Sequence, residues 1–160
     1  MIVTPDIFQG EIAIGQINHP DVIAGVQWFI DKYEPKYLRL MLGGKLYDEL
    51  VAELSKEIPE EKWVKLAHRL RTPCAGYIYY YIRRDSASET AGAGEVLTEA
   101  ENAIRRSPAK KMAFAWNEMV DRNRRFVGEK YAGAFESYAP SKGREYDSLF
   151  AYINPIFTGL

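Results

Sequence analysis

The chain has 160 residues, of which 47% are hydrophobic and 27% charged. This composition fits one globular domain and differs from that of disordered or fibrous proteins. Lysine and arginine number 21 against 22 aspartate and glutamate residues, which leaves a net charge of -1 and gives no global positive field for nucleic acid. No apolar run approaches the roughly 18 residues of a membrane span, and no signal peptide is visible. We therefore expect a protein of the cytoplasm, or of a particle assembled there.

The first 19 residues are predicted to form an extended N-terminal arm. Ile12 and Ile14 alternate with polar or small neighbours, which allows at most a short strand. Residues 140–160 are aromatic and punctuated by proline and glycine, and they are predicted to form a C-terminal arm. Neither arm has a helical period that would bury its apolar groups internally, so both are expected to reach neighbouring molecules.

Between residues 20 and 84, apolar side chains recur every three or four positions, which predicts the first helical half of the chain. Pro20 favours the first position of a helix. Pro35 predicts a kink or a restart rather than a loop. Gly43 or Gly44, in a left-handed conformation, is expected to end this helix.

A second helix is predicted from residue 45 to about residue 56, and a third run begins at Pro59. The third run keeps its helical spacing across Pro73, so one kinked helix or two abutting helices would both fit. Cys74 lies on the apolar stripe of this run, where a buried and unreactive thiol is the favoured interpretation.

The second half of the chain begins after a low-complexity break. Residues 85–94 carry only small and polar side chains and predict a mobile loop. A short helix is expected at 95–106, and Ser-Pro at 107–108 predicts the start of the next helix. A stripe over 112–138 then predicts one long helix. The fold class that follows is all-α: a single domain over 1–160, built as a bundle of about five helices with one long helix in the C-terminal half.

The inventory for chemistry is small. Cys74 is the single cysteine, and the only histidines are His19 and His68. No nucleophile motif, catalytic triad or metal-ligand spacing can be assembled from them. We therefore expect no catalytic, cofactor-binding or metal-binding residues and no small-molecule substrate, and an enzyme is the least favoured interpretation.

Basic residues gather around the predicted long helix, and acidic residues are interleaved with the later ones. A solvated helix face is favoured over contact with DNA because Glu118, Asp121 and Glu129 offset the charge. The basic residues are Arg105, Arg106, Lys110, Lys111, Arg122, Arg124 and Arg125.

Aromatic content is high, with 11 Tyr, 7 Phe and 3 Trp residues. Tyrosine suits subunit contacts, because it is apolar on its faces and polar at its tip. Tyrosines that cap a small helical core are an equal alternative. The candidate interface residues are Ile12, Ile14, Tyr79, Tyr80, Tyr146, Phe150, Tyr152, Ile156 and Phe157.

Two long stretches, FIDKYEPKYLRLMLGGKLYDEL (29–50) and AGYIYYYIRRDSASETAGAGEV (75–96), are followed by AENAIRRSP and AWNEMVDRN. In this order they resemble a family of small tailed-phage and prophage proteins encoded among virion structural genes. The layout is similar to that of helical head–tail connector, or head-completion, proteins. No active-site residue comes with this resemblance.

The resemblance implies a helical core with arms, assembled with other copies of itself into a ring between the portal and the next neck or tail protein. It also implies a place in the host cytoplasm and then at the head–tail junction of the virion. Contact of the basic residues with packaged DNA is the less favoured alternative to a solvated helix face. The alternative is a small helical protein-binding or regulatory module of a mobile element that acts through the helix around Trp116.

Overall fold

The computed structural model describes residues 1–89 and 108–154, and in these ranges the chain is helical without strands. The helices are α1 (Pro20–Leu42), α2 (Gly44–Leu54), α3 (Glu61–Glu89), α4 (Pro108–Gly128) and α5 (Arg144–Ser148). Three short 3₁₀ turns accompany them: η1 (Pro5–Ile7), η2 (Gly10–Ile12) and η3 (Ala132–Ala134). The predicted all-α bundle is confirmed.

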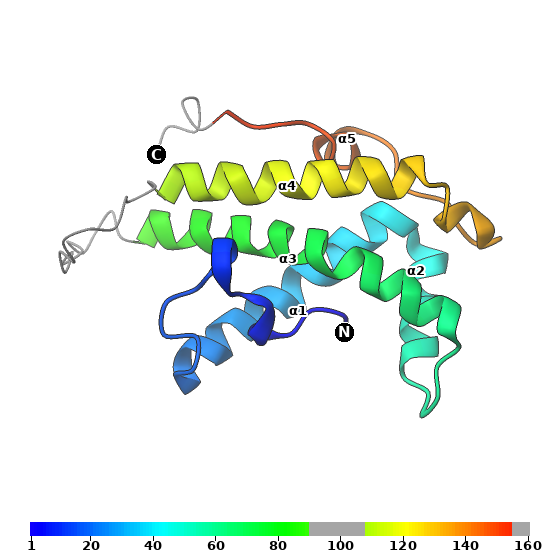
Figure 1. Ribbon diagram of the computed structural model, residues 1–160, viewed down its shortest axis with the longest axis horizontal. Coiled ribbons are helices and arrows are strands. Elements are labelled where there is room, and N and C mark those ends of the chain that lie inside the picture. The colour runs from blue at the N-terminus through cyan, green and yellow to red at the C-terminus, as the bar shows by residue number, and fades with distance from the viewer. Residues whose placement is uncertain (90–107, 155–160) are drawn as a thin grey trace.

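Two long antiparallel helices, α3 and α4, lie side by side and form the centre of the fold (Figure 1). Helix α1 crosses α3, and α2 packs beside the first half of α3. In the N-terminal segment, η1 contacts α1 and η2 contacts α4. The segment that follows α5 runs along α4 (Figure 1).

Helix α1 begins at Pro20, as the sequence predicts. His19 caps it by accepting a hydrogen bond from the Asp21 N–H at 3.3 Å. Pro35 lies inside the helix, which continues past it to Leu42. Since Pro35 has no N–H, one bond of the helical ladder is missing there, but packing of the apolar face keeps the helix unbroken.

Gly43 connects α1 and α2, and its φ of 84° is positive as expected. Its ψ of 159° differs from that of the common left-handed cap, so the chain turns sharply into α2. A Cβ atom at this position would lie 2.0 Å from the Ala139 carbonyl oxygen. The nearby Ala139 N–H donates to the Leu42 carbonyl at 3.2 Å. Glycine is therefore required both by the backbone conformation and by the close approach of a distant segment.

Helix α3 is one helix, with Pro73 inside it, and it extends to Glu89. Residues 85–89 are therefore helical, and the prediction of a loop from residue 85 is wrong for them. Alanine, serine and glutamate tolerate a helix, and residues just before them are anchored: Arg83 donates to the Ala13 carbonyl at 2.9 Å. Residues 90–94 and the helix predicted at 95–106 lie outside the described residues.

Helix α4 begins at Pro108, as predicted, but ends at Gly128. The predicted helix over 112–138 is therefore too long by ten residues. Lys130 has a positive φ of 53°, and the turn η3 follows at once. The apolar residues that continued the stripe pack in this turn instead, with the Phe135 ring 4.9 Å from that of Trp63.

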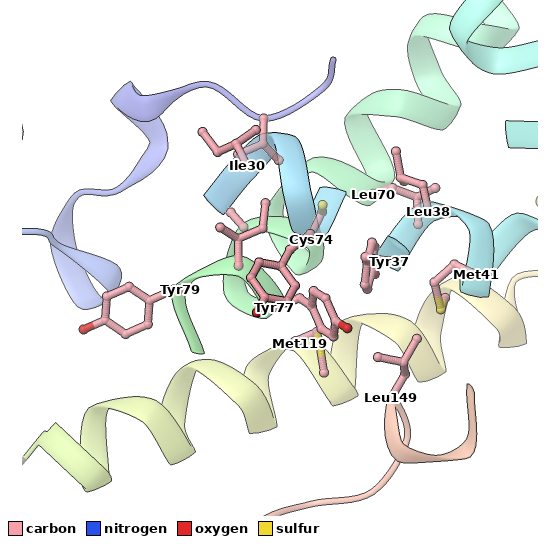
Figure 2. Packing of buried hydrophobic residues seen from close by; sticks show 14 of the residues in the cluster. Ile30, Tyr37, Leu38, Met41, Leu70, Cys74, Tyr77, Tyr79, Met119 and Leu149 are labelled. Carbon is pink, nitrogen blue, oxygen red and sulfur yellow. The ribbon is translucent and has the colours of Figure 1, made fainter. Parts of the chain in front are cut away.

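The core is formed by all four long helices and by both terminal segments. Tyr37, Tyr77, Met119 and Leu149 gather at its centre (Figure 2). The two long central helices approach each other closely at Gly76, where a Cβ atom would lie 3.0 Å from the Ala115 carbonyl oxygen. A small residue at this point lets the two backbones pack at short distance.

The N-terminal segment, residues 1–14, folds back onto this core. Val3 and Phe8 are fully buried, so the expectation that the arms cannot bury their apolar groups internally is wrong. The burial comes from irregular turns rather than from a helical period, and Arg71 reinforces it by donating to Thr4 Oγ1 at 3.1 Å. Periodicity alone does not detect this kind of packing.

Glu34 holds the N-terminal segment in place from the middle of α1. Its buried carboxylate accepts hydrogen bonds from the Ile2 N–H at 3.0 Å and from the Val3 N–H at 2.8 Å. Burial nevertheless raises the pKa of the Glu34 carboxyl above its usual 4.5, because removing the charge from water costs more than these bonds return.

The Glu34→Gln variant is expected to gain stability relative to the wild type as the pH rises. The folded-state pKa of Glu34 is raised, so its contribution to wild-type stability is fully present below the unfolded value of 4.5 and is lost as the pH rises through the folded-state pKa. Urea unfolding midpoints of both chains from about pH 4 to about pH 7 measure this. If the difference between the two unfolding midpoints stays constant with pH, or if the wild type gains stability relative to the variant as the pH rises, the burial of this carboxyl is contradicted.

Candidate functional site

The residues after α5 lie along α4 and are held by its side chains (Figure 1). We call residues 149–154 the C-terminal strap. Trp116 Nε1 donates to the Ala151 carbonyl at 2.9 Å. Asn117 pairs with both backbone groups of Ile153, donating to the carbonyl at 3.1 Å and accepting from the N–H at 2.9 Å. This side chain therefore fixes the register of the strap on the helix.

Two more side chains of α4 hold the beginning of the strap. Asn123 donates to the Leu149 carbonyl at 3.0 Å, and Arg124 donates to the Phe150 carbonyl at 2.7 Å. Later strap residues thus contact earlier residues of α4, so the strap runs antiparallel to the helix. The hydrogen bonds from Trp116, Asn117, Asn123 and Arg124 all end on main-chain atoms of the strap, so α4 holds chiefly the backbone of the strap.

Burial along the strap is uneven. Leu149 is fully buried, and Figure 2 shows its side chain pointing into the core. Phe150 and Ile153 are half-buried, whereas Tyr152 is 52% exposed and donates its hydroxyl hydrogen to Asp121. One apolar anchor and a row of hydrogen bonds therefore hold the strap, and little of it is covered by the core.

A series of aromatic rings joins α1, α3 and α4 and ends at Trp116, the residue that also holds the strap. Consecutive rings lie 4.2 to 6.0 Å apart between centroids, a spacing at which aromatic rings attract one another. We call this series the aromatic band. In order along the series, its members are Trp28, Phe29, Tyr33, Tyr81, Tyr80 and Trp116.

The aromatic band passes from solvent into the core. Trp28 is 54% exposed, Phe29, Tyr80 and Tyr81 are half-buried, and Tyr33 and Trp116 are buried. Half-buried tryptophan and tyrosine, supported from below by rigid neighbours, are the side chains that most often dominate the binding energy of protein interfaces. The band is therefore our candidate protein interface.

Two cations lie over the exposed part of the band. Lys32 Nζ is 4.5 Å from the centre of the Trp28 ring, and the Arg84 guanidinium is 4.4 Å from the centre of the Tyr81 ring. Cations over aromatic faces are stabilising, and a charged rim around aromatic anchors is typical of interfaces. Arg84 is also paired with Asp85 of the same helix at 3.0 Å. A partner with a carboxylate for Lys32 beside an apolar centre would therefore match this surface.

The structure separates the predicted interface residues into accessible and inaccessible ones. Tyr79 is fully buried and accepts a hydrogen bond from Arg83 Nε at 3.1 Å, so it is not available to a partner. Ile12 and Ile14 are half-buried against the chain's own core. Tyr80 belongs to the aromatic band.

Tyr146 and Phe150 are half-buried beside each other, with ring centroids 4.9 Å apart. Tyr152 is exposed on the strap. Tyr146 lies on α5, which contacts α1, whereas Phe150 and Tyr152 lie on the strap, and none of the three belongs to the aromatic band. Ile156 and Phe157 lie outside the described residues.

Sequence reasoning missed the exposed end of the band. Trp28, Phe29 and Lys32 lie in the predicted first helical half, but they are not among the predicted interface residues. The spacing of four between Trp28 and Lys32 was a usable signal, because such pairs meet on a helix. No local pattern could have placed Tyr33 on Tyr81, since these rings stack at 4.2 Å from two different helices.

The basic residues of α4 divide between internal contacts and solvent. Arg124 bonds to the strap and lies over the Tyr152 ring at 4.4 Å. Arg122 and Arg125 line a hollow of about 240 Å³ together with His68, Arg69 and other side chains of α3 and α4. Glu129 pairs with Arg69 in this hollow and offsets part of the charge. Arg105 and Arg106 lie outside the described residues.

A hollow of about 450 Å³ lies beside η3. Its walls include Trp63, Tyr131 and Phe135, and in it Ser137 donates a hydrogen bond to Glu49. Trp63 comes from α3, whereas Tyr131 and Phe135 flank η3, so this hollow marks the place where the predicted long helix gives way to a turn.

The groups considered for chemistry lie apart from one another. Cys74 is fully buried, and burial raises the pKa of its thiol, so it remains protonated as expected. Among residues 1–89 and 108–154, no three histidine, cysteine or carboxylate side chains lie close enough to hold a metal ion. Within the same residues, the helices are too short or too polar to cross a membrane.

Trp116 bears on the alternative of a regulatory helix. Its ring is 6% exposed, and its N–H is bonded to the strap. This residue therefore contacts the chain's own strap, and a binding module would have to use another face.

Comparisons with known proteins found no match: no family model, no curated protein and no solved structure corresponds to this chain. The resemblance to connector proteins accordingly stays a prediction.

Proposed function

We propose that the chain is a non-enzymatic structural protein of a tailed phage or prophage, a head–tail connector that oligomerises at the portal or neck. The observation that carries this proposal is the aromatic band with its two cations, Lys32 and Arg84. A large aromatic surface left in contact with water costs free energy that association would recover. The resemblance to connector proteins names the assembly in which this association takes place.

The exposed end of the band is the expected contact with a neighbour. Trp28 leaves more than half of its surface in solvent, while Tyr33, two rings further along, is fixed by a stacked contact with Tyr81. An anchor of this kind is presented in a defined direction, because the rings behind it are packed. Copies of this chain and the portal or the next neck protein are the proposed partners.

The Trp28→Ser variant tests the proposal in a binding assay with the portal protein of the same genome. We expect the wild type to sediment with the portal and the variant to lose binding by roughly tenfold or more, as expected for a hot-spot residue. Val64→Ser, which removes an apolar side chain that is 46% exposed on α3, is the matched control and is expected to bind normally. No binding of the wild type, or equal binding of both variants, would contradict the proposal.

Contact with packaged DNA is the weaker part of this proposal. Arg122 and Arg125 face the hollow between α3 and α4, where phosphate groups would have access to them. If they bind DNA, retention of the protein on a DNA column falls steeply with salt.

A further inference from the structure

The surface of α4 under the C-terminal strap is a binding site for an extended segment of chain. Trp116, Asn117, Asn123 and Arg124 all direct their polar atoms at main-chain groups. Because Asn117 both donates and accepts, it satisfies one residue of the strap in the way that a neighbouring strand would.

This site requires an occupant. Asn123 is fully buried. Its amide oxygen accepts a hydrogen bond from the Tyr37 hydroxyl at 2.5 Å, and its amide nitrogen donates one to the Leu149 carbonyl at 3.0 Å. If the strap left, the amide of Asn123 would lose one partner, and the space filled by Leu149 would open to water. Both changes are costly, so an empty site is disfavoured.

The site does not specify which copy of the chain supplies the occupant. Its hydrogen bonds would be identical if the strap came from a second copy, since every group involved is present in each copy. The chain before the strap also has a pivot. Gly143 has a φ of 101°, and the space around its missing Cβ is open. A change of direction there would carry α5 and the strap away together, and it would require the ion pair between Lys36 of α1 and Glu145 of α5, at 3.1 Å, to break and form again on the neighbouring copy.

We propose that neighbouring copies exchange their C-terminal straps, so that the strap of one copy occupies the α4 site of the next. The inference rests on the proposed function, because it names the link between subunits of the connector. A strap tethered to its own α4 acts at an effective concentration of about millimolar. The chain therefore keeps its own strap when dilute and exchanges it when copies are crowded in an assembly. A head-to-tail exchange of this kind closes into a ring.

Two single-cysteine variants test the exchange. Asp121→Cys places a thiol on α4, and Tyr152→Cys places one on the strap, at two positions that are hydrogen-bonded in the wild type. The native Cys74 is fully buried and does not compete. The two variants are co-expressed and concentrated to about millimolar. Their oligomers are separated by size-exclusion chromatography, their masses are measured by light scattering, and each fraction is treated with a short bismaleimide.

We expect a linked dimer of the two variants, in roughly tenfold excess over the dimer formed when Val64→Cys replaces Asp121→Cys. A chain carrying both Asp121→Cys and Tyr152→Cys is the positive control, because it links within one molecule when dilute. Assembled species without the linked dimer would overturn the exchange and leave the proposed function intact. Monomers without the linked dimer would overturn the exchange and also count against self-assembly.

Discussion

Gly43→Ala is expected to destabilise the chain by about 3 kcal/mol or more, because two independent penalties meet at this residue. A φ of 84° with a ψ of 159° is a conformation that essentially only glycine adopts, and another residue there costs on the order of 1–3 kcal/mol. The added Cβ would also lie 2.0 Å from the Ala139 carbonyl oxygen. That oxygen belongs to backbone that is bonded to α1, so it cannot move aside cheaply.

Gly44→Ala is the matched control for this experiment. Gly44 is the first residue of α2, and a Cβ atom there would meet only the end of the Arg39 side chain at 3.5 Å. Alanine is favoured over glycine in a helix by up to about 1 kcal/mol, so Gly44→Ala is expected to be neutral or stabilising. Urea unfolding of both variants makes the comparison. Equal stabilities would show that the turn at Gly43 does not have this conformation.

Asn123→Leu is the second change with a large expected effect, about 2–5 kcal/mol. Leucine has the same branched heavy-atom skeleton as asparagine but cannot form a hydrogen bond with either partner. The Tyr37 hydroxyl and the Leu149 carbonyl are therefore both left buried without a hydrogen-bond partner. Burial raises the pKa of Tyr37 well above its usual range, so its hydroxyl cannot escape this cost by ionising.

Two further variants separate this effect from a simple packing defect. Adding Tyr37→Phe to Asn123→Leu removes one of the unpaired groups, so the double variant is expected to recover part of the lost stability. Asn117→Leu breaks bonds on the half-buried part of the strap and is expected to cost only about 1 kcal/mol. Unfolding in urea measures all of them, and strictly additive losses for the double variant would contradict the buried network.

The sequence was most informative where the chain follows a regular period. The start of α1 at Pro20, its continuation past Pro35 and the start of α4 at Pro108 were all predicted from proline positions and apolar stripes. The glycine turn at Gly43 was predicted as well, although its contact with Ala139 was not, because those residues are far apart in the sequence.

Errors arose where periodicity carried no information or was misleading. The stripe kept its spacing after Gly128 although the helix ends there: the chain turns through η3, where Tyr131 and Tyr138 are half-buried and Ala134 is exposed. Val3 and Phe8 fill the core from irregular structure that no period reveals. The aromatic band could be predicted only in part, since Tyr80 and Tyr81 stand in α3 but the ring that stacks on Tyr81, that of Tyr33, comes from α1.

The proposed function requires that copies of this chain join into a closed assembly. Its most direct test is the mass of the wild-type protein in solution, measured by light scattering from dilute samples up to about millimolar, with negative-stain images of the heaviest species. We predict a discrete multiple of the 18.3 kDa chain mass that appears as the concentration rises, with ring-shaped particles. A mass that stays at 18.3 kDa over the whole range would contradict the claim.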